Sequence, residues 1–284
     1  MNDITQVKIC RHQDCRYKAL ALAEYCWFHL ENKRHYRGDL ELRVEMGTDL
    51  SGANLAGAVL EKIRLPNAKL AHADLSGVRF ASVDLSGADL SGAELHGSDL
   101  RSARLLRLQG SGARFEGAFL SGCNFEYAQL ADTNFSHADL RGAQFTGASL
   151  YQARMDFAVL EGADFSNADL SFAILGGAHA SDAIFHEADL SRSNLVGTDL
   201  ERANLSGANL FYARPGRAKL RKANLTNARL ERTIFREADL TEAKLVKADL
   251  SGAVLERAIL EGADLSDSNL GAANINCALL SDEV

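Results

Sequence analysis

The amino-acid sequence predicts a solenoid, a rod of short stacked units, preceded by a small N-terminal module. Three observations predict it: a strict five-residue period of large apolar residues, a column of small residues two positions before each of them, and a group of Cys and His residues near the N-terminus. The composition agrees, because only two prolines and 7% aromatic residues accompany 46% apolar residues, which is typical of a repetitive array.

The five-residue period begins at Leu50 and continues without a shift to Leu280. Of these 47 positions, 44 carry Leu, Phe, Met or Ile, and the exceptions are Gly110, Ala180 and Pro215. A period of five matches neither the roughly 3.6 residues per turn of an α-helix nor the roughly two of a β-strand, so the chain must bend in every unit. Residues two positions apart in an extended segment share a side, so we expect the large and small residues to point inward.

This pattern, as in SGADL-SGAEL over residues 86–95 and ERANL-SGANL over residues 201–210, resembles the pentapeptide-repeat proteins. The resemblance covers residues 46–280. It implies an all-β solenoid, a right-handed quadrilateral β-helix in which each unit forms one side of a square and four units form a coil. We therefore expect a solenoid of about twelve coils over residues 46–284, about 55 Å long at about 4.8 Å per layer, behind a capping module over residues 1–45.

Stacked coils place side chains 20 positions apart on the same face. We expect one internal ladder of four phenylalanines and a shorter ladder on a neighbouring face, namely Phe125, Phe145, Phe165 and Phe185 in the first and Phe115 and Phe135 in the second. Such a filled interior leaves no cavity for a cofactor. Cys123 and Cys277 are expected to be small buried residues. The breaks at Gly110 and Pro215 are either structural imperfections or functional kinks.

The N-terminal module contains the pattern Cys10-x4-Cys15-x10-Cys26-x2-His29. These spacings suit one tetrahedral structural zinc ion, with His12 as a spare ligand, and the pattern resembles small bacterial zinc-finger-like knuckles. A metal ion would supply the stability that so short a segment cannot obtain from apolar burial. The alternative is a helical cap with three reduced thiols and no metal.

The rest of the module is expected to cover the first coil. Apolar residues recur at helix-like spacing in residues 18–24 and 27–30, and an open solenoid end exposes core residues and unpaired backbone groups. A nucleic-acid contact is the alternative role, through the cations Arg11, Arg16, Lys18, Lys33, Arg34 and Arg37. The acidic residues between these cations leave the segment nearly neutral, which disfavours that alternative.

Two groups of outward residues depart from the usual Asp, Asn, Ser and Gly. Aromatic residues with one arginine follow large residues of the same face, and a belt of cations lies just beyond them, including Arg229, Arg232 and Arg236. Aromatic residues and arginine are the usual anchors of protein interfaces, whereas scattered aromatics and solvated charges are the plainer interpretation. The predicted partner-binding residues are Tyr151, Phe172, Arg192, Phe211, Tyr212, Arg214, Arg217 and Arg221.

These features predict a non-enzymatic scaffold that presents side-chain columns to a protein partner and takes no small-molecule substrate. No base–nucleophile pair, phosphate loop or dinucleotide motif is evident. The resemblance implies an alternative, because some pentapeptide-repeat proteins mimic duplex DNA and bind DNA gyrase and other type II topoisomerases. The net charge of −7 is compatible with that alternative, but the mixed charge columns and the Cys/His module argue against it.

Two expectations concern location and assembly. The sequence has no run of about 18 apolar residues and no signal-peptide pattern, so we expect a cytoplasmic protein without membrane contact. At the C-terminal end, only residues 281–284 follow the last unit, which is too little to cover a coil. Leu279 and Leu280 are therefore predicted to join two chains end to end in a two-fold homodimer.

Overall fold

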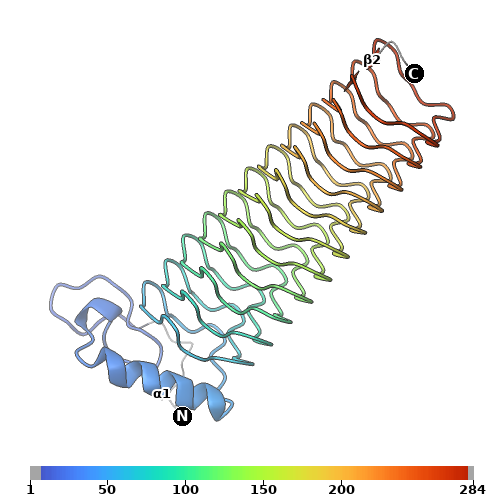
Figure 1. Cartoon of the computed structure of the whole chain (residues 1–284). Coiled ribbons are helices and arrows are strands. Elements are labelled where there is room, and N and C mark those ends of the chain that lie inside the picture. Colours follow the sequence, from blue (N-terminus) through green and yellow to red (C-terminus); the bar gives the residue numbers. More distant parts are fainter. Residues whose placement is uncertain (1–7, 281–284) are drawn as a thin grey trace.

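The computed structural model describes residues 8–280, with Leu280 by its backbone alone, and the solenoid is a rod of stacked coils (Figure 1). Parallel bridges pair each unit with the unit 20 residues further along, from Asp49↔Lys69 to Val254↔Asn274. At the end of the rod the pairing forms two short strands, β1 (Ile259–Leu260) and β2 (Leu279–Leu280). The constant separation of 20 confirms four units per coil.

Each unit bends the chain by the same tight turn. In the first unit, the Ala53 N–H donates to the Leu50 carbonyl at 3.0 Å, and Gly52 has a φ of +70°. A positive φ at the third residue of such a turn is type II geometry, which favours glycine. Many units carry another residue there, such as Phe172 with a φ of +60°. Their left-handed backbone is held by the ladder hydrogen bonds to the neighbouring coil, such as that from the Phe172 N–H to the Ser191 carbonyl at 2.9 Å.

The two predicted inward columns form the core, in which Phe125 and Leu250 are fully buried. The first phenylalanine ladder is confirmed, because successive rings from Phe125 to Phe185 stack with centroids 4.8, 4.8 and 5.0 Å apart. Phe115 and Phe135 also stack, at 5.0 Å. Their predicted neighbouring face is wrong: two units separate them from the first ladder, so they lie on the opposite face and meet it edge-on, with Phe125 and Phe135 at 5.8 Å.

The break at Gly110 is an exchange of volume between two columns. Leu108 stands in the small column and is fully buried. A Cβ atom on Gly110 would lie 2.9 Å from Leu130 Cδ2 and 3.3 Å from Leu108 Cδ2, so the Leu108 side chain fills the space that a large residue would take. The backbone ladder continues through the break, because the Gly110 N–H donates to the Gln129 carbonyl at 2.8 Å.

The break at Pro215 removes one rung of the ladder. Proline has no N–H, and within residues 8–280 the bridge between Arg214 and Ile234 is missing. The reverse hydrogen bond persists, from the Ile234 N–H to the Ala213 carbonyl at 2.9 Å. The coils therefore stay in register through the proline.

The two cysteines of the solenoid differ in their environment. Cys123 is buried, as predicted, and its thiol lies 2.9 Å from the Leu100 carbonyl. Burial raises the pKa of the Cys123 thiol to about 12, so it remains protonated. Cys277 is exposed, and the prediction that it is buried is wrong. It occupies the third turn position, with a φ of +55°, rather than the small column.

The N-terminal module contains a short 3-10 helix, η1 (Trp27–His29), and one α-helix, α1 (Lys33–Glu45), which lies across the end of the rod (Figure 1). The helix begins after Asn32, whose side chain accepts the His35 N–H at 2.9 Å. Its buried residues Tyr36, Leu40 and Val44 join the core of the rod.

The helix that residues 18–24 suggested is wrong. That segment is a loop in which Leu22 has a φ of +62°, and a left-handed residue at this point ends any helix. The cap instead uses α1, which places three buried side chains over the first coil. Neither α1 nor η1, the helices within residues 8–280, could cross a membrane.

Candidate functional site

The knuckle and η1 bring the four predicted metal ligands together. Cys10 and Cys15 flank a turn in which the Cys15 N–H donates to the His12 carbonyl at 3.2 Å. Cys26 and His29 flank η1, where the His29 N–H donates to the Cys26 carbonyl at 3.1 Å. Each pair therefore projects from one compact turn, and the loop between the pairs folds back so that they meet.

The ligand atoms have the spacing of a tetrahedral metal site. All four lie within 4.8 Å of one another. His29 Nδ1 is 3.5 Å from Cys10 Sγ and 3.4 Å from Cys26 Sγ, and the Sγ atoms of Cys15 and Cys26 are 3.9 Å apart. Tetrahedral zinc with Zn–S of about 2.3 Å and Zn–N of about 2.0 Å requires separations of about 3.8 Å between sulfurs and about 3.6 Å between sulfur and nitrogen. The residues present therefore fit a zinc ion.

The environment of the cluster favours a thiolate at Cys10. Burial raises the pKa of the Cys10 thiol, but hydrogen bonds from the backbone of Cys26 and His12 and from the His29 side chain outweigh burial and lower this pKa to about 6. The pKa of the Cys15 thiol is raised, first by burial and then by the neighbouring thiols. Thiols crowded together in this way favour a cation among them, because the metal ligand is the thiolate.

His12 is not brought into the cluster as a ligand. Its ring stacks on His29, with centroids 3.8 Å apart, and its Nδ1 lies 2.9 Å from the Gln13 carbonyl. The predicted spare ligand therefore supports the orientation of His29 from outside, a role in which ring stacking fixes a ligand.

The loop between the two ligand pairs binds the first coil. The Ala21 N–H donates to the Asn54 carbonyl at 2.7 Å, and Asn54 Nδ2 donates to the Ala19 carbonyl at 2.7 Å. Tyr36 of α1 donates its hydroxyl to the Ala21 carbonyl at 2.9 Å. The knuckle, the helix and the first coil are thus joined around one short segment, and a four-ligand site at this place is suited to structure rather than catalysis.

The predicted aromatic residues lie together on one corner of successive coils, and we call Tyr151, Phe172, Arg192, Phe211 and Tyr212 the aromatic strip. The rings of Tyr151 and Phe172 are 5.7 Å apart, and Arg192 Cζ lies 5.4 Å from the Phe172 centroid. The Arg192 N–H donates to the Phe211 carbonyl at 2.8 Å, and the rings of Phe211 and Tyr212 are 4.6 Å apart. The strip is therefore one continuous surface.

Arg232 extends the strip and was not among the predicted partner-binding residues. Its Cζ lies 5.3 Å from the Tyr212 centroid, and its guanidinium donates to the Tyr212 hydroxyl. The signal was its position 20 residues after Tyr212, which in a coil of 20 residues places one side chain over the other.

The basic belt does not form one surface with the strip. Arg214 lies on the face that follows Tyr212, beside a hollow of about 230 Å³ at Gly216. Arg217 and Arg221 lie at further positions around the same coil and pair with acids of the next coil, Arg217 with Glu237 at 2.8 Å and Arg221 with Asp239 at 3.3 Å. Residues adjacent in sequence are carried to different faces, so the belt encircles the rod.

One base–nucleophile contact in the solenoid escaped the sequence analysis. His186 Nδ1 lies 3.0 Å from Ser206 Oγ, in the next coil. The Ser206 hydroxyl also donates to Asn204 Oδ1 at 2.8 Å, and His186 is exposed on the surface. A hydroxyl committed to a turn acceptor on an open surface lacks the enclosed, oriented setting of a catalytic serine.

A family model described as pentapeptide repeats matches overlapping stretches of the chain from residues 46–80 to residues 233–271. A search of curated proteins found no match. Among solved structures, HetL, a pentapeptide repeat protein involved in heterocyst differentiation regulation from the cyanobacterium Nostoc sp., is 30% identical, with 86% of this chain and 96% of that chain covered and a TM-score of 0.48.

Two further structures are similar. A trypsin-treated form of QnrB1, a plasmid-mediated fluoroquinolone resistance protein, is 23% identical, with coverage of 79% and 89% and a TM-score of 0.46. A pentapeptide repeat protein from the Arabidopsis thaliana thylakoid lumen is 30% identical, with coverage of 39% and 71% and a TM-score of 0.20. All three TM-scores are low, so the assignment rests on the repeat match. Its units match from residue 46 to residue 271, and the chain therefore belongs to the pentapeptide-repeat family.

Proposed function

We propose that this protein is a non-enzymatic interaction scaffold whose partner surface is the aromatic strip. The observation that carries the proposal is the unbroken series of contacts from Tyr151 through Phe172 and Arg192 to Tyr212 on one corner of the rod. Tyr151, Phe172 and Tyr212 expose 38%, 40% and 37% of their surface. Aromatic side chains that are already held in place lose little entropy on binding, which makes them effective anchors.

The N-terminal module is proposed to hold one zinc ion in a structural role. The fit of the four ligand atoms to tetrahedral geometry supports this, as does the direct bonding of the intervening loop to Asn54. When bound, the ion supplies cross-links between Cys10, Cys15, Cys26 and His29. These residues then hold the loop and α1 over the first coil, so that core side chains there do not meet water.

A DNA-mimicking binder of DNA gyrase or another type II topoisomerase is the alternative, and the charge pattern disfavours it. Many carboxylates on the rod are neutralised locally. The Arg101 guanidinium beside Asp99 and the Arg141 guanidinium beside Asp139 hold the pKa of these carboxyls below its usual value. Others are bound to turn N–H groups, as Asp84 Oδ1 is to Ser86 at 3.1 Å. A mimic of duplex DNA needs free negative charge along its length.

Replacing two anchors of the strip is expected to abolish partner binding without unfolding the rod. In the Phe172→Ala/Tyr212→Ala variant, retention of the partner from a lysate of the source organism should fall about tenfold or more, since interface anchors contribute about 1 kcal/mol or more each. Capture followed by quantitative mass spectrometry measures this. The thermal unfolding midpoint should change little, because both side chains project outward from turns.

The matched control is Tyr127→Ala/Phe157→Ala, which removes two exposed aromatics from the same turn position on other corners, at φ values of +56° and +57°. It should retain the partner. Equal recovery by all three proteins would contradict the strip as the partner surface. In parallel, inhibition of supercoiling by purified DNA gyrase would select the alternative, and we expect none.

The proposed homodimer rests on the last described coil. Leu270 and Ile275 occupy the inward large column yet are 39% and 47% exposed, and Leu279 is 53% exposed. Residues 281–284 and the Leu280 side chain lie outside the described residues. An apolar coil end with unpaired strand groups can be covered by a second copy of the same end.

Light scattering at tens of micromolar is expected to give twice the chain mass of 30.7 kDa for the wild type and the single mass for Leu279→Glu, because a buried charge breaks the contact in both copies. Val196→Glu, at an exposed valine in the middle of the rod, is the matched control and should stay dimeric. A wild type that is monomeric at this concentration would overturn the dimer.

A further inference from the structure

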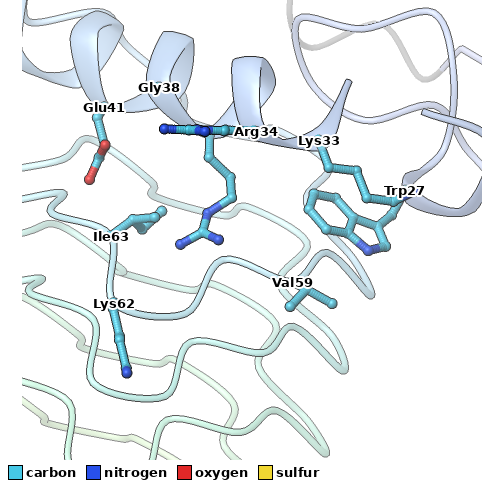
Figure 2. A pocket seen from close by; sticks show the side chains of 9 residues that line it. Trp27, Lys33, Arg34, Gly38, Glu41, Val59, Lys62 and Ile63 are labelled. Carbon is cyan, nitrogen blue, oxygen red and sulfur yellow. The ribbon is translucent and has the colours of Figure 1, made fainter. Parts of the chain in front are cut away.

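A groove separates α1 from the first coils of the solenoid. Its volume is about 700 Å³, which is within the usual range of binding sites. Figure 2 shows Lys33, Arg34 and Gly38 on the helix side and Val59 and Ile63 on the solenoid side. The groove therefore has an apolar floor from the first coil beneath a helix that carries cations.

The charges of the groove are strongly one-sided. Lys33, Arg34, Arg37 and Lys62 line it, and its one carboxylate within residues 8–280, Glu41, is already used: Oε1 accepts the Arg64 N–H at 2.8 Å. No acidic residue stands in the first turn of α1. Cations at a helix N-terminus run against the helix dipole and cost stability, so folding alone does not account for them.

Gly38 is a second feature that folding alone does not account for. It lies inside α1, where glycine is less favourable than alanine. A Cβ atom on Gly38 would meet nothing within 4 Å, so no packed neighbour requires a glycine. Because Gly38 lines the groove, the missing side chain leaves its wall open to close approach by a backbone.

The backbone edge of the first coil is capped on both sides of the groove but not within it. Asn54 is bonded to the Ala19–Ala21 segment, and the Arg64 N–H to Glu41. Between them lies Val59, whose N–H and carbonyl bond to no group of residues 8–280, although its side chain lines the groove. Corresponding residues in later coils, such as Arg79, donate to the preceding coil. An unpaired strand edge is the usual template for an added peptide strand.

We propose that this groove binds a short acidic segment of a partner protein, in extended form, with its backbone against Val59 and its carboxylates among Lys33, Arg34, Arg37 and Lys62. The unpaired edge and the apolar floor favour a peptide over nucleic acid. Trp27, the aromatic residue of the groove, is 8% exposed, and Lys33 Nζ lies 5.7 Å from its centroid, so no open face is offered to a base.

The cations that would extend a nucleic-acid surface lie elsewhere and are paired. Arg11 contacts Glu24 at 2.6 Å, and Lys18 contacts Asp74 at 3.6 Å. The groove is also more than four coils from the aromatic strip, so the two surfaces are independent: Val59 and Tyr151 are 92 residues apart in a repeat of 20. Loss of one surface does not imply loss of the other.

The test is fluorescence anisotropy with a short synthetic peptide in which aspartate alternates with valine, titrated with the full chain. We expect saturable binding that weakens with added salt. The Arg34→Ala/Lys62→Ala variant should bind about tenfold more weakly, because two exposed cations facing the ligand are lost. The control, Lys69→Ala/Arg104→Ala, removes the same charge from exposed positions outside the groove and should bind within about twofold of the wild type.

Gly38→Leu gives an independent readout, because it fills the groove while improving the helix. It should abolish peptide binding without lowering the thermal unfolding midpoint. Equal weakening by the control variant would show nonspecific attraction and overturn the proposal. So would tighter binding of a single-stranded oligonucleotide or of inorganic phosphate through the same cations. Peptide binding that appears only after deletion of residues 2–7 would identify the chain itself as the occupant and also overturn it.

Discussion

Restoring the regular pattern at the Gly110 break is expected to give a large compensating effect between two substitutions. Gly110→Leu alone should lose about 2–3 kcal/mol of unfolding free energy, because a side chain there collides with Leu130 and Leu108. Leu108→Ala alone should lose about 3 kcal/mol, because it empties a fully buried site. The double variant has the ordinary small and large residues and should lie within about 1 kcal/mol of the wild type.

Denaturant unfolding followed by circular dichroism measures the four proteins of this cycle. The expected coupling is about 4 kcal/mol in the restoring direction. Leu108→Ala combined with Leu250→Ala is the matched control, and these fully buried leucines, 142 residues apart, should act additively. A coupling below about 0.5 kcal/mol between positions 108 and 110 would show that Leu108 does not occupy the space beside Gly110.

The second large effect is expected from loss of the metal. Purified protein should hold about one equivalent of zinc, and Cys26→Ser less than about a tenth. Zinc binding contributes on the order of 10 kcal/mol in small zinc-finger peptides, so its loss is enough to unfold a module of this size. Hydrogen exchange should then lose protection at the Ala21 and Arg64 amides, which bond the module to the first coil, and keep it in the middle of the rod.

Cys277→Ser is the control, because Cys277 is exposed and lies outside the cluster, and its metal content should match the wild type. Metal analysis and thiol titration decide the result. A wild type with almost no zinc, whose Cys10, Cys15 and Cys26 all react freely with a thiol reagent, would contradict the metal centre.

The errors of the sequence analysis share a cause. The basic belt was interpreted as one surface because its members are close in sequence, but in a coil of 20 residues, neighbours such as Arg217 and Arg221 turn onto different corners. Helix α1 was missed although Tyr36, Leu40 and Val44 are spaced by four and Asn32 is a typical N-cap. The apolar Ala and Leu residues of 18–24 had drawn the helical interpretation instead.

The sequence by itself determined the solenoid, its inward columns and the four candidate ligands, because these depend on spacing within one short unit or one turn. The coil of 20 residues came from the family resemblance, since a period of five does not state how many units close a square. Tertiary structure alone decided that Tyr212 meets Arg232, that Leu108 fills the space at Gly110, and that Val59 lies at an uncapped edge beneath α1. Each of these contacts joins residues through the stacking of coils or the docking of the cap, and the side-chain volumes and backbone partners that set them appear only once the chain is folded.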